Sequence, residues 1–182
     1  MNSNDSPEPF DAGRRRPWYR PGRRTLAEFS VIILLLIALS LWMTRHMLER
    51  SSHAPALQLP ALHSGELSSL NWPSPQERTL VYFFAPWCSI CRLSVPGLNL
   101  LSGNDNLRVV AIALSWEEKE EVGRFVSETG FNGEVLLGTP QTQQQYQVTG
   151  YPSYYVIDRD GRVLHSDRGL STPPGLWLRT TL

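Results

Sequence analysis

Two cysteines three positions apart are the residues of this chain whose types and spacing could do redox chemistry. The tetrapeptide Cys88-Ser-Ile-Cys91 contains the only two cysteines among the 182 residues. Residues three apart lie on one face of a helix, so the two sulfurs can bond to each other. A disulfide that closes so small a loop removes little entropy from the unfolded chain and is a weak structural staple. The spacing therefore predicts a disulfide that is made and broken.

The sequence before the cysteines predicts a strand that delivers them to the first turn of a helix. Residues 79–85 form an apolar run, followed by Pro86 and Trp87, and a helix is expected at residues 88–101. The unpaired amides and the dipole of a helix N-terminus stabilise a thiolate there. An inert, structural cysteine pair is the alternative interpretation.

The rest of the globular part alternates between strand and helix signals. This order predicts an α/β fold with a central mixed sheet flanked by helices on both faces. Ser115 is expected to cap the helix that Gly130 ends, because glutamates that suit the positive end of the helix dipole follow it. The other expected elements are a leading hairpin at 57–70, strands at 107–114, 134–137, 154–157 and 162–165, and a short helix at 141–146.

A long apolar segment lies near the start of the chain. No residue between Phe29 and Thr44 is charged, and residues 26–44 are expected to form a transmembrane signal anchor. Six arginines precede the segment and only two follow it closely, a bias that puts the N-terminus in the cytoplasm. A signal peptide cleaved at residues 54–56 and a soluble core helix are the alternatives.

These signals divide the chain into four parts. We expect a disordered cytoplasmic tail at residues 1–25, the anchor at 26–44, a tether at 45–56 and one globular domain at 57–182. Residues 51–182 carry 9 basic and 12 acidic side chains, a net charge of about −3, which provides no basic face for nucleic acid. Whether the apolar segment stays as an anchor or is cleaved as a signal peptide, the cysteines are expected outside the cytoplasm, where disulfides form and persist.

Three motifs together resemble those of the thioredoxin superfamily. They are Trp87 with Cys-x-x-Cys after a strand, Pro96 inside the expected active helix, and Gly150-Tyr151-Pro152 before a strand. The leading hairpin, an extra αβ unit before Gly150 and the anchor look more like the TlpA/ResA branch of membrane-anchored periplasmic thiol–disulfide oxidoreductases. The closest likeness is to the copper-sensitivity-suppressor D (ScsD-like) proteins. The resemblance covers about residues 57–170 and implies a thioredoxin-like fold.

The same resemblance implies a role for each site residue. Cys88 is the exposed, activated nucleophile and Cys91 the shielded resolving thiol, with Trp87 covering the sulfurs. Pro152 is cis and faces the cysteines, while the backbone of Tyr151 pairs with an extended substrate. The implied function is disulfide exchange with protein substrates. The implied location is the bacterial inner membrane, with the catalytic domain in the periplasm. A membrane thiol-transfer protein would donate electrons, and no cofactor is implied.

Two departures from the family pattern leave the redox direction open. Tyr82 stands where thioredoxins carry a buried aspartate, and Ser94 stands where ResA-like reductases carry a glutamate. Neither position therefore offers an acidic group to assist deprotonation of the resolving thiol. A reductant or isomerase in a membrane thiol relay is slightly favoured, whereas Arg92 next to Cys91 would stabilise a thiolate and pull the other way.

A copper(I) chaperone that binds through both thiolates is the alternative function. Chaperones on this fold usually combine a wider cysteine spacing with a distal histidine. Here no histidine adjoins Gly150-Tyr151-Pro152, and the four histidines share no ligand spacing, so no metal site is expected. The candidate substrates of the oxidoreductase are haem-site cysteines in cytochrome c biogenesis, misoxidised secreted proteins and targets of copper stress.

Overall fold

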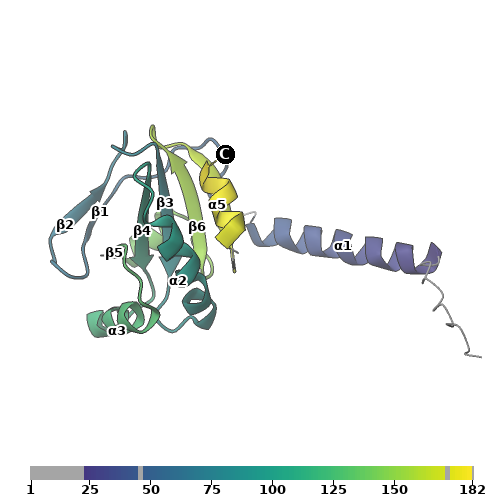
Figure 1. Cartoon of the computed structure of the whole chain (residues 1–182), viewed down its shortest axis with the longest axis horizontal. Coiled ribbons are helices and arrows are strands. Elements are labelled where there is room, and N and C mark those ends of the chain that lie inside the picture. Colours follow the sequence, from purple (N-terminus) through teal and green to yellow (C-terminus); the bar gives the residue numbers. More distant parts are fainter. Residues whose placement is uncertain (1–22, 45–46, 171–172, 182) are drawn as a thin grey trace, which may run out of the picture. The chain divides into compact units, whose positions relative to one another are not determined.

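The computed structural model describes residues 23–44, 47–170 and 173–181 (Figure 1). Most of the predicted tail, residues 1–22, therefore lies outside the described residues. Contacts within the chain divide it into two units, residues 1–39 and 40–182.

Helix α1 spans Arg23–Thr44 and includes the whole segment predicted as an anchor, so the prediction of a helix there is confirmed. Its large apolar side chains between Phe29 and Leu39 are 50–64% exposed. Among the residues whose side chains the structure describes, no helix is sufficiently long and apolar to span a bilayer.

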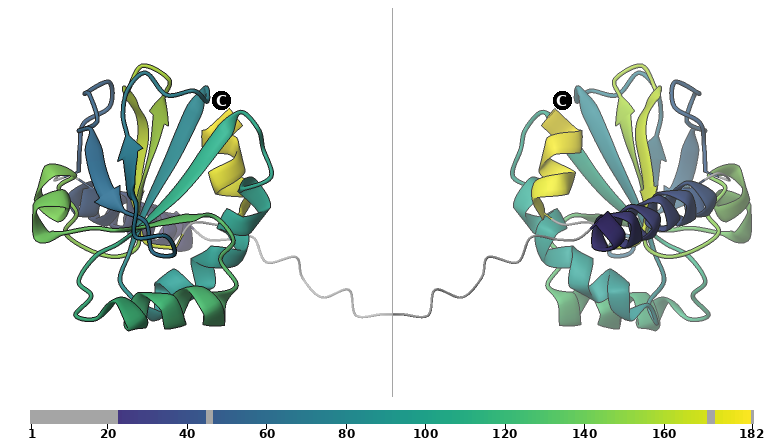
Figure 2. Two further views of the ribbon diagram at one scale, coloured as in Figure 1. Left: turned by 90° about the vertical axis from the view of Figure 1, so that its left-hand side faces the viewer. Right: turned by 90° about the vertical axis from the view of Figure 1, so that its right-hand side faces the viewer.

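A five-stranded mixed sheet in the order β5-β4-β3-β6-β7 forms the centre of the globular unit (Figure 2). Strand β3 (Arg78–Phe84) is the middle strand, parallel to β4 (Leu107–Ala113) and antiparallel to β6 (Ser153–Asp158). Strand β5 (Glu134–Leu137) extends the sheet parallel to β4, and β7 (Val163–Arg168) runs antiparallel to β6. The predicted mixed sheet is confirmed, including the extra strand before Gly150.

Successive side chains of β3 point to opposite faces of the sheet and build two cores. Leu80, Tyr82 and Phe84 belong to one core, and Val81 and Phe83 belong to the other. None of these five side chains is more than 2% exposed. Because both faces are covered, the strand reads as a continuous apolar run rather than as an alternating one.

Three helices cover the first face of the sheet: α2 (Ser89–Leu101), α3 (Lys119–Thr129) and α5 (Pro173–Thr181). The ring of Phe84 stacks on that of Phe125 in α3, with 4.5 Å between their centroids. The sequence did not predict α5, which lies against α2. Its Leu176 is buried in the same core.

The prediction that Ser115 caps the helix after β4 is wrong. Helix α3 begins at Lys119, after the extended residue Glu118, which makes no side-chain cap. The helix ends at Gly130 as predicted, where φ is 65° and the residue has the left-handed conformation that glycine adopts without strain. Ser115 also has a left-handed backbone, with φ of 51°.

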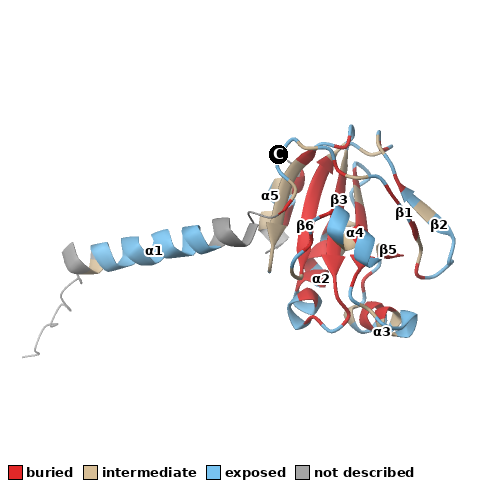
Figure 3. Ribbon diagram, turned by 180° about the vertical axis from the view of Figure 1, so that it is seen from behind, coloured by how far each residue is buried: buried red, intermediate tan, exposed pale blue. Residues whose placement is uncertain are grey.

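The second face is covered by a hairpin and a short helix. Strands β1 (Leu57–Pro60) and β2 (Leu67–Leu70) pair as a separate antiparallel sheet, and α4 (Pro140–Gln145) lies on the same side. Figure 3 shows the buried residues concentrated in the central strands and exposed residues on α4. Helices therefore flank both faces, as predicted.

The segment predicted as a tether at residues 45–56 is packed onto the domain from Met47 onward. Met47 is 4% exposed and belongs to the second core. The backbone of Ser51 donates to the carbonyl of Val163 in β7 at 2.8 Å, and Val163 donates to the carbonyl of Ser52 at 2.9 Å. These bonds cover the outer edge of β7, which would otherwise lack a neighbouring strand. Residues 45–46 lie outside the described residues.

Candidate active site

Three loops meet at one edge of the sheet because of the way their strands pair. Strands β3 and β4 are parallel, with Phe84 opposite Ala113, so the loops that follow them start at the same edge. Strand β6 is antiparallel to β3, with Ser153 opposite Phe83, so the loop before β6 ends at this edge too. The loops carry the chemistry-bearing residues of the site: Trp87 and Cys88, then Ser115, then Tyr151 and Pro152.

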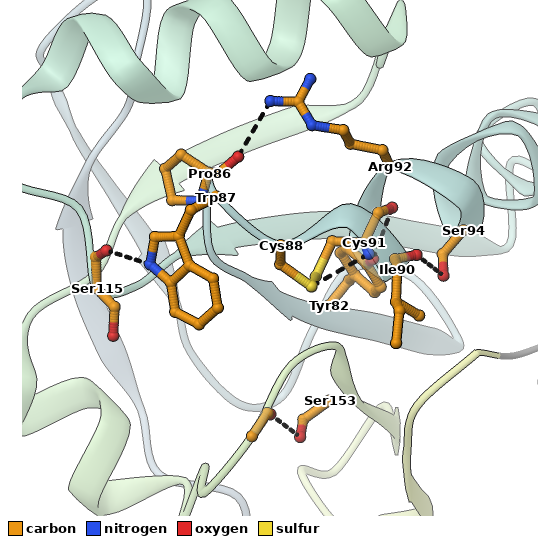
Figure 4. Close-up of a disulfide and its surroundings, with 11 residues drawn as sticks. Tyr82, Pro86, Trp87, Cys88, Ile90, Cys91, Arg92, Ser94, Ser115 and Ser153 are labelled. Carbon is orange, nitrogen blue, oxygen red and sulfur yellow. Dashed lines mark hydrogen bonds between the residues drawn. A yellow bond between two sulfur atoms is a disulfide. The ribbon is translucent and has the colours of Figure 1, made fainter.

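Cys88 and Cys91 form a disulfide at the N-terminus of α2, which confirms the predicted bond (Figure 4). Their Cα atoms are 5.3 Å apart, and Cys88 is the residue immediately before the helix. The sulfur of Cys88 accepts a hydrogen bond from the backbone N–H of Cys91 at 3.2 Å. The same amide and the helix dipole would stabilise a negative charge on this sulfur after reduction.

The two sulfur-bearing residues differ in burial. Cys88 is 6% exposed and Cys91 is 0% exposed, so the order of accessibility is as predicted. The prediction of an exposed Cys88 is nevertheless wrong for the disulfide form, in which the residue is largely covered. Two large apolar side chains beside the disulfide are exposed, Trp87 at 67% and Ile90 at 47%.

Trp87 and Tyr151 contact each other and are both bonded to Ser115. Their rings meet edge to face, with 5.8 Å between the centroids. The indole N–H of Trp87 donates to the carbonyl of Ser115 at 3.1 Å, and the hydroxyls of Ser115 and Tyr151 lie 2.9 Å apart. Burial raises the pKa of Tyr151, and the hydrogen bond with Ser115 opposes this effect. The Tyr151 hydroxyl is therefore neutral at physiological pH.

The peptide bond between Tyr151 and Pro152 is cis, as predicted. The bend is supported by its neighbours, since the Ser153 hydroxyl donates to the carbonyl of Gly150 at 2.8 Å. Figure 4 places Ser153 across from the helix end that carries the cysteines. Tyr151 also packs against the core that contains both cysteines, so the cis-proline loop and the disulfide border the same core.

Neutral hydroxyls border the buried Cys91. The hydroxyl of Tyr82 donates to the carbonyl of Cys91 at 3.3 Å, and that of Ser94 donates to the carbonyl of Ile90 at 3.1 Å. Burial raises the pKa of Tyr82 well above its ordinary value, although a hydrogen bond with Ser94 opposes the shift. Both side chains can fix the first turns of α2, but neither can accept a proton as a carboxylate does.

The guanidinium of Arg92 contacts groups other than the sulfurs. Its guanidinium forms an ion pair with Glu128, donates to the carbonyl of Pro86 at 3.2 Å and lies 5.3 Å from the centroid of the Phe125 ring. Figure 4 shows the guanidinium reaching towards Pro86. All three contacts are with groups other than the sulfurs, and the effect on the thiols that the sequence suggested for Arg92 stays a prediction.

The described part of the chain holds no group of three or more histidine, cysteine, aspartate or glutamate side chains placed to bind a metal ion. In the disulfide form, the sulfurs of Cys88 and Cys91 are bonded to each other. Copper(I) binding by the reduced pair stays an alternative prediction.

Comparison with known proteins places the chain in a family. Residues 51–166 match the model of the AhpC/TSA family. The chain belongs to this family. It is 31% identical over 118 residues to the thioredoxin-like protein YneN of Bacillus subtilis, an alignment that covers 63% of this chain and 68% of YneN. It is also 36% identical over 92 residues to the thiol:disulfide interchange protein DsbE homolog of Paracoccus denitrificans, and it spans only 50% of the length of that protein.

Solved structures share the fold of this AhpC/TSA-family chain. A Chlorobium tepidum protein assigned as thiol:disulfide interchange protein DsbE matches 72% of this chain and 95% of its own, with a TM-score of 0.66 and 25% identity. StoA from Bacillus subtilis, at 18% identity, has a TM-score of 0.60 over 70% of this chain and 97% of StoA. The thioredoxin-like fold and the likeness to DsbE-like proteins of the TlpA/ResA branch are confirmed. The narrower likeness to copper-sensitivity-suppressor D proteins stays a prediction.

Of the five residues that the sequence assigns to the site, Trp87, Cys88, Tyr151 and Pro152 lie in the loops that meet at this edge, and Cys91 lies in the first turn of α2. Their catalytic and binding roles stay predictions. The sequence reasoning missed Ser115, which it places at a helix cap because glutamates follow it. A signal was available, because Ser115 follows a buried strand parallel to the one that delivers Cys88. Loops at the carboxyl ends of neighbouring parallel strands lie together and commonly carry binding residues.

Proposed function

We propose that this chain is a thiol–disulfide oxidoreductase that exchanges disulfides with protein substrates through Cys88 and Cys91. One observation carries the proposal: the disulfide lies at the N-terminus of α2, and the Cys88 sulfur accepts the N–H of Cys91. The cis bond before Pro152 belongs to a loop at the same sheet edge. Relatives named as thiol:disulfide interchange proteins support the same activity.

The reduced pair would reduce a substrate in two displacement steps. The thiolate of Cys88 attacks one sulfur of the substrate disulfide, so that a mixed disulfide forms and the other substrate sulfur leaves as a thiolate that takes up a proton. Cys91 then loses its proton and attacks the sulfur of Cys88, which releases the second substrate thiol. Two electrons have passed to the substrate, and the enzyme is left as the disulfide. The same steps in reverse oxidise a substrate dithiol.

The burial of the two residues supports these roles. Cys88 retains some exposure and receives the helix amide, whereas Cys91 is fully covered and can reach only a sulfur already bound at Cys88. Trp87 and Ile90 provide exposed apolar surface beside the disulfide. The backbone of Tyr151 would hold an extended substrate segment as an added strand.

We also propose that residues 26–44 anchor the protein in a bacterial inner membrane, with the domain in the periplasm. The arginines before this segment and the exposed apolar side chains of α1 support this location. A reducing role there requires electrons from a membrane thiol-transfer protein. The proposed cellular roles of this exchange activity are cytochrome c biogenesis and copper tolerance.

Trapping of mixed disulfides tests the activity in the full chain. Cys91→Ala removes the resolving thiol, so we expect this variant to accumulate disulfide-linked complexes with substrate proteins. A reducing agent should separate these complexes by cleaving the mixed disulfide. Cys88→Ala, expressed at the same level, is the matched control and should trap nothing. Complexes formed equally by both variants, or by neither, would contradict the assigned roles. Labelling of the free Cys88 thiol in the reduced, untrapped Cys91→Ala chain by a thiol reagent that cannot cross the inner membrane tests the location separately.

A further inference from the structure

Ser115 occupies an unusual position in the loop after β4. Its φ of 51° lies in the left-handed region, which residues other than glycine, asparagine and aspartate seldom adopt. It follows the end of β4 by two residues, at the sheet edge where the cysteine loop and the cis-proline loop also lie. A conformation that is unfavourable for serine persists only when contacts around it hold it in place.

The contacts of Ser115 join the other two loops of the site. Its carbonyl accepts the indole N–H of Trp87 at 3.1 Å, and its hydroxyl lies 2.9 Å from the hydroxyl of Tyr151. Trp87 directly precedes Cys88, and Tyr151 directly precedes Pro152. One residue thus uses its backbone to hold the neighbour of the outer cysteine and its side chain to hold the neighbour of the cis-proline.

The two aromatic residues depend on Ser115 to different degrees. Trp87 is 67% exposed, so little packing restrains its ring apart from the edge-to-face contact with Tyr151. The Tyr151 hydroxyl has a second partner in the side-chain oxygen of Gln143, but at 3.4 Å this contact is longer than that with Ser115. The Tyr151 ring also packs against both cores, so Ser115 contributes the shorter hydrogen bond to its hydroxyl, whereas the exposed ring of Trp87 depends more heavily on its bond to Ser115.

Ser115 also borders space into which a bound polypeptide can extend. Ser115 and Gln143, the two partners of the Tyr151 hydroxyl, line a hollow of about 390 Å³ together with Trp116 and Pro140. A segment held along Tyr151 would pass the rim of this hollow. Small thiol reagents need only the sulfur of Cys88 and would not extend so far.

We propose that Ser115 is a positioning residue for polypeptide substrates: it holds Trp87 and Tyr151 in the orientation that a peptide backbone needs in order to dock beside Cys88. The proposal rests on the proposed disulfide-exchange function. It predicts that loss of the Ser115 hydroxyl slows exchange with peptides and leaves exchange with small thiols unchanged. A residue that served only the stability of the fold would not separate the two substrates.

The test compares two dithiol reductants of the oxidised full chain, dithiothreitol and a short synthetic peptide that carries two cysteines, so that one molecule of either supplies both electrons. Second-order rate constants for loss of the Cys88–Cys91 disulfide are measured by alkylation and gel shift. We expect Ser115→Ala to slow the peptide reaction about 3- to 10-fold, the range that loss of one hydrogen bond produces. The reaction with dithiothreitol should stay within about twofold of the unmodified chain, because loss of this hydrogen bond leaves the Cys88 sulfur in place.

Two further variants show whether the effect acts through the contact with Tyr151. Tyr151→Phe removes the other hydroxyl, and the double variant with Ser115→Ala should react with the peptide no more slowly than the slower single variant. Ser127→Ala is the matched control, because it removes an exposed serine hydroxyl that bonds only to the carbonyl of Arg124 within α3. Its rates with both reductants should equal those of the unmodified chain.

Each outcome decides between the two proposals. Equal slowing of both reductants by Ser115→Ala, or no slowing with the peptide, overturns the positioning role while the exchange function stands. Additive effects of Ser115→Ala and Tyr151→Phe also overturn it. An unmodified chain whose disulfide reacts with neither reductant overturns the exchange function itself and the positioning role with it.

Discussion

Arg92 provides a test of how the active helix is held in place. It directly follows Cys91 and makes three contacts outside its own helix. Its guanidinium pairs with Glu128, donates to the carbonyl of Pro86 at 3.2 Å and lies over the Phe125 ring, 5.3 Å from the centroid. The residue thus joins the start of α2 to the loop before it and to α3.

The three contacts differ in their expected contribution to stability. The side chains of Arg92 and Glu128 are 41% and 55% exposed, so solvent reduces the ion pair to about 0.5 kcal/mol. A hydrogen bond from a charged donor to the Pro86 carbonyl contributes about 1 kcal/mol once exposure is allowed for. The stacking of the guanidinium on the Phe125 ring adds about 0.5–1 kcal/mol. Arg92→Ala should therefore lower the free energy of unfolding by about 2 kcal/mol, and Glu128→Ala by only about 0.5 kcal/mol.

Urea denaturation of the oxidised chain, followed by tryptophan fluorescence, measures both losses. The cost of Glu128→Ala should nearly vanish at about 1 M NaCl, where salt screens the exposed pair, whereas most of the cost of Arg92→Ala should persist. Arg124→Ala is the matched control, since it removes another exposed arginine, from α3, that lines one surface hollow together with Arg92 and Glu128. Equal losses for Arg92→Ala and Glu128→Ala, or a loss for Arg92→Ala that disappears in salt, would refute the reasoning.

Gly161, Met47 and His165 offer three more tests by urea denaturation. Gly161 has φ of 88°, and an added Cβ would lie 2.5 Å from the Trp72 ring, so Gly161→Ala should cost about 2–4 kcal/mol. An unchanged urea midpoint for Gly161→Ala would contradict this predicted loss of stability. Met47→Ala should cost about 2 kcal/mol if residues from Met47 onward are docked, and nothing if they form a free tether. For His165, burial and then the Arg50 charge lower the pKa, so the unfolded chain binds the proton more readily and stability falls as pH drops below about 6.5. His165→Gln should flatten this decline, and an unaltered slope would count against it.

The elements that local patterns specify were predictable. The apolar runs of β3 and β4 are long enough to be buried on both faces, and they appear at the predicted places. The turn between β6 and β7 follows from Asp158 and Gly161, since glycine supplies the positive φ there. The disulfide follows from cysteine spacing alone. Each of these features depends on residues that are close together in the sequence.

The features that the sequence did not predict depend on contacts between distant residues. Ser115 fits a helix cap locally, but its hydroxyl bonds to Tyr151, 36 positions away. Met47 and its neighbours look like a polar linker, yet their partners in β7 lie more than a hundred positions later. Helix α5 begins with two prolines and contains a glycine, a composition typical of a loop, and the burial of Leu176 against the core overrides it.

The surroundings of the two cysteines make their chemistry unequal even though their sequence is nearly symmetric. The Cys88 sulfur receives an amide hydrogen at the positive end of α2, which favours the charged form of a reduced thiol. Cys91 is fully buried in the core, and its polar neighbours Tyr82 and Ser94 are neutral hydroxyls, which favours the uncharged form. In the proposed exchange reaction, the negative charge of the reduced pair would therefore lie on Cys88. The proton would stay on Cys91 until a substrate bound at Cys88 draws that thiol into the second displacement, so burial and helix geometry would order the two proposed steps without a catalytic carboxylate.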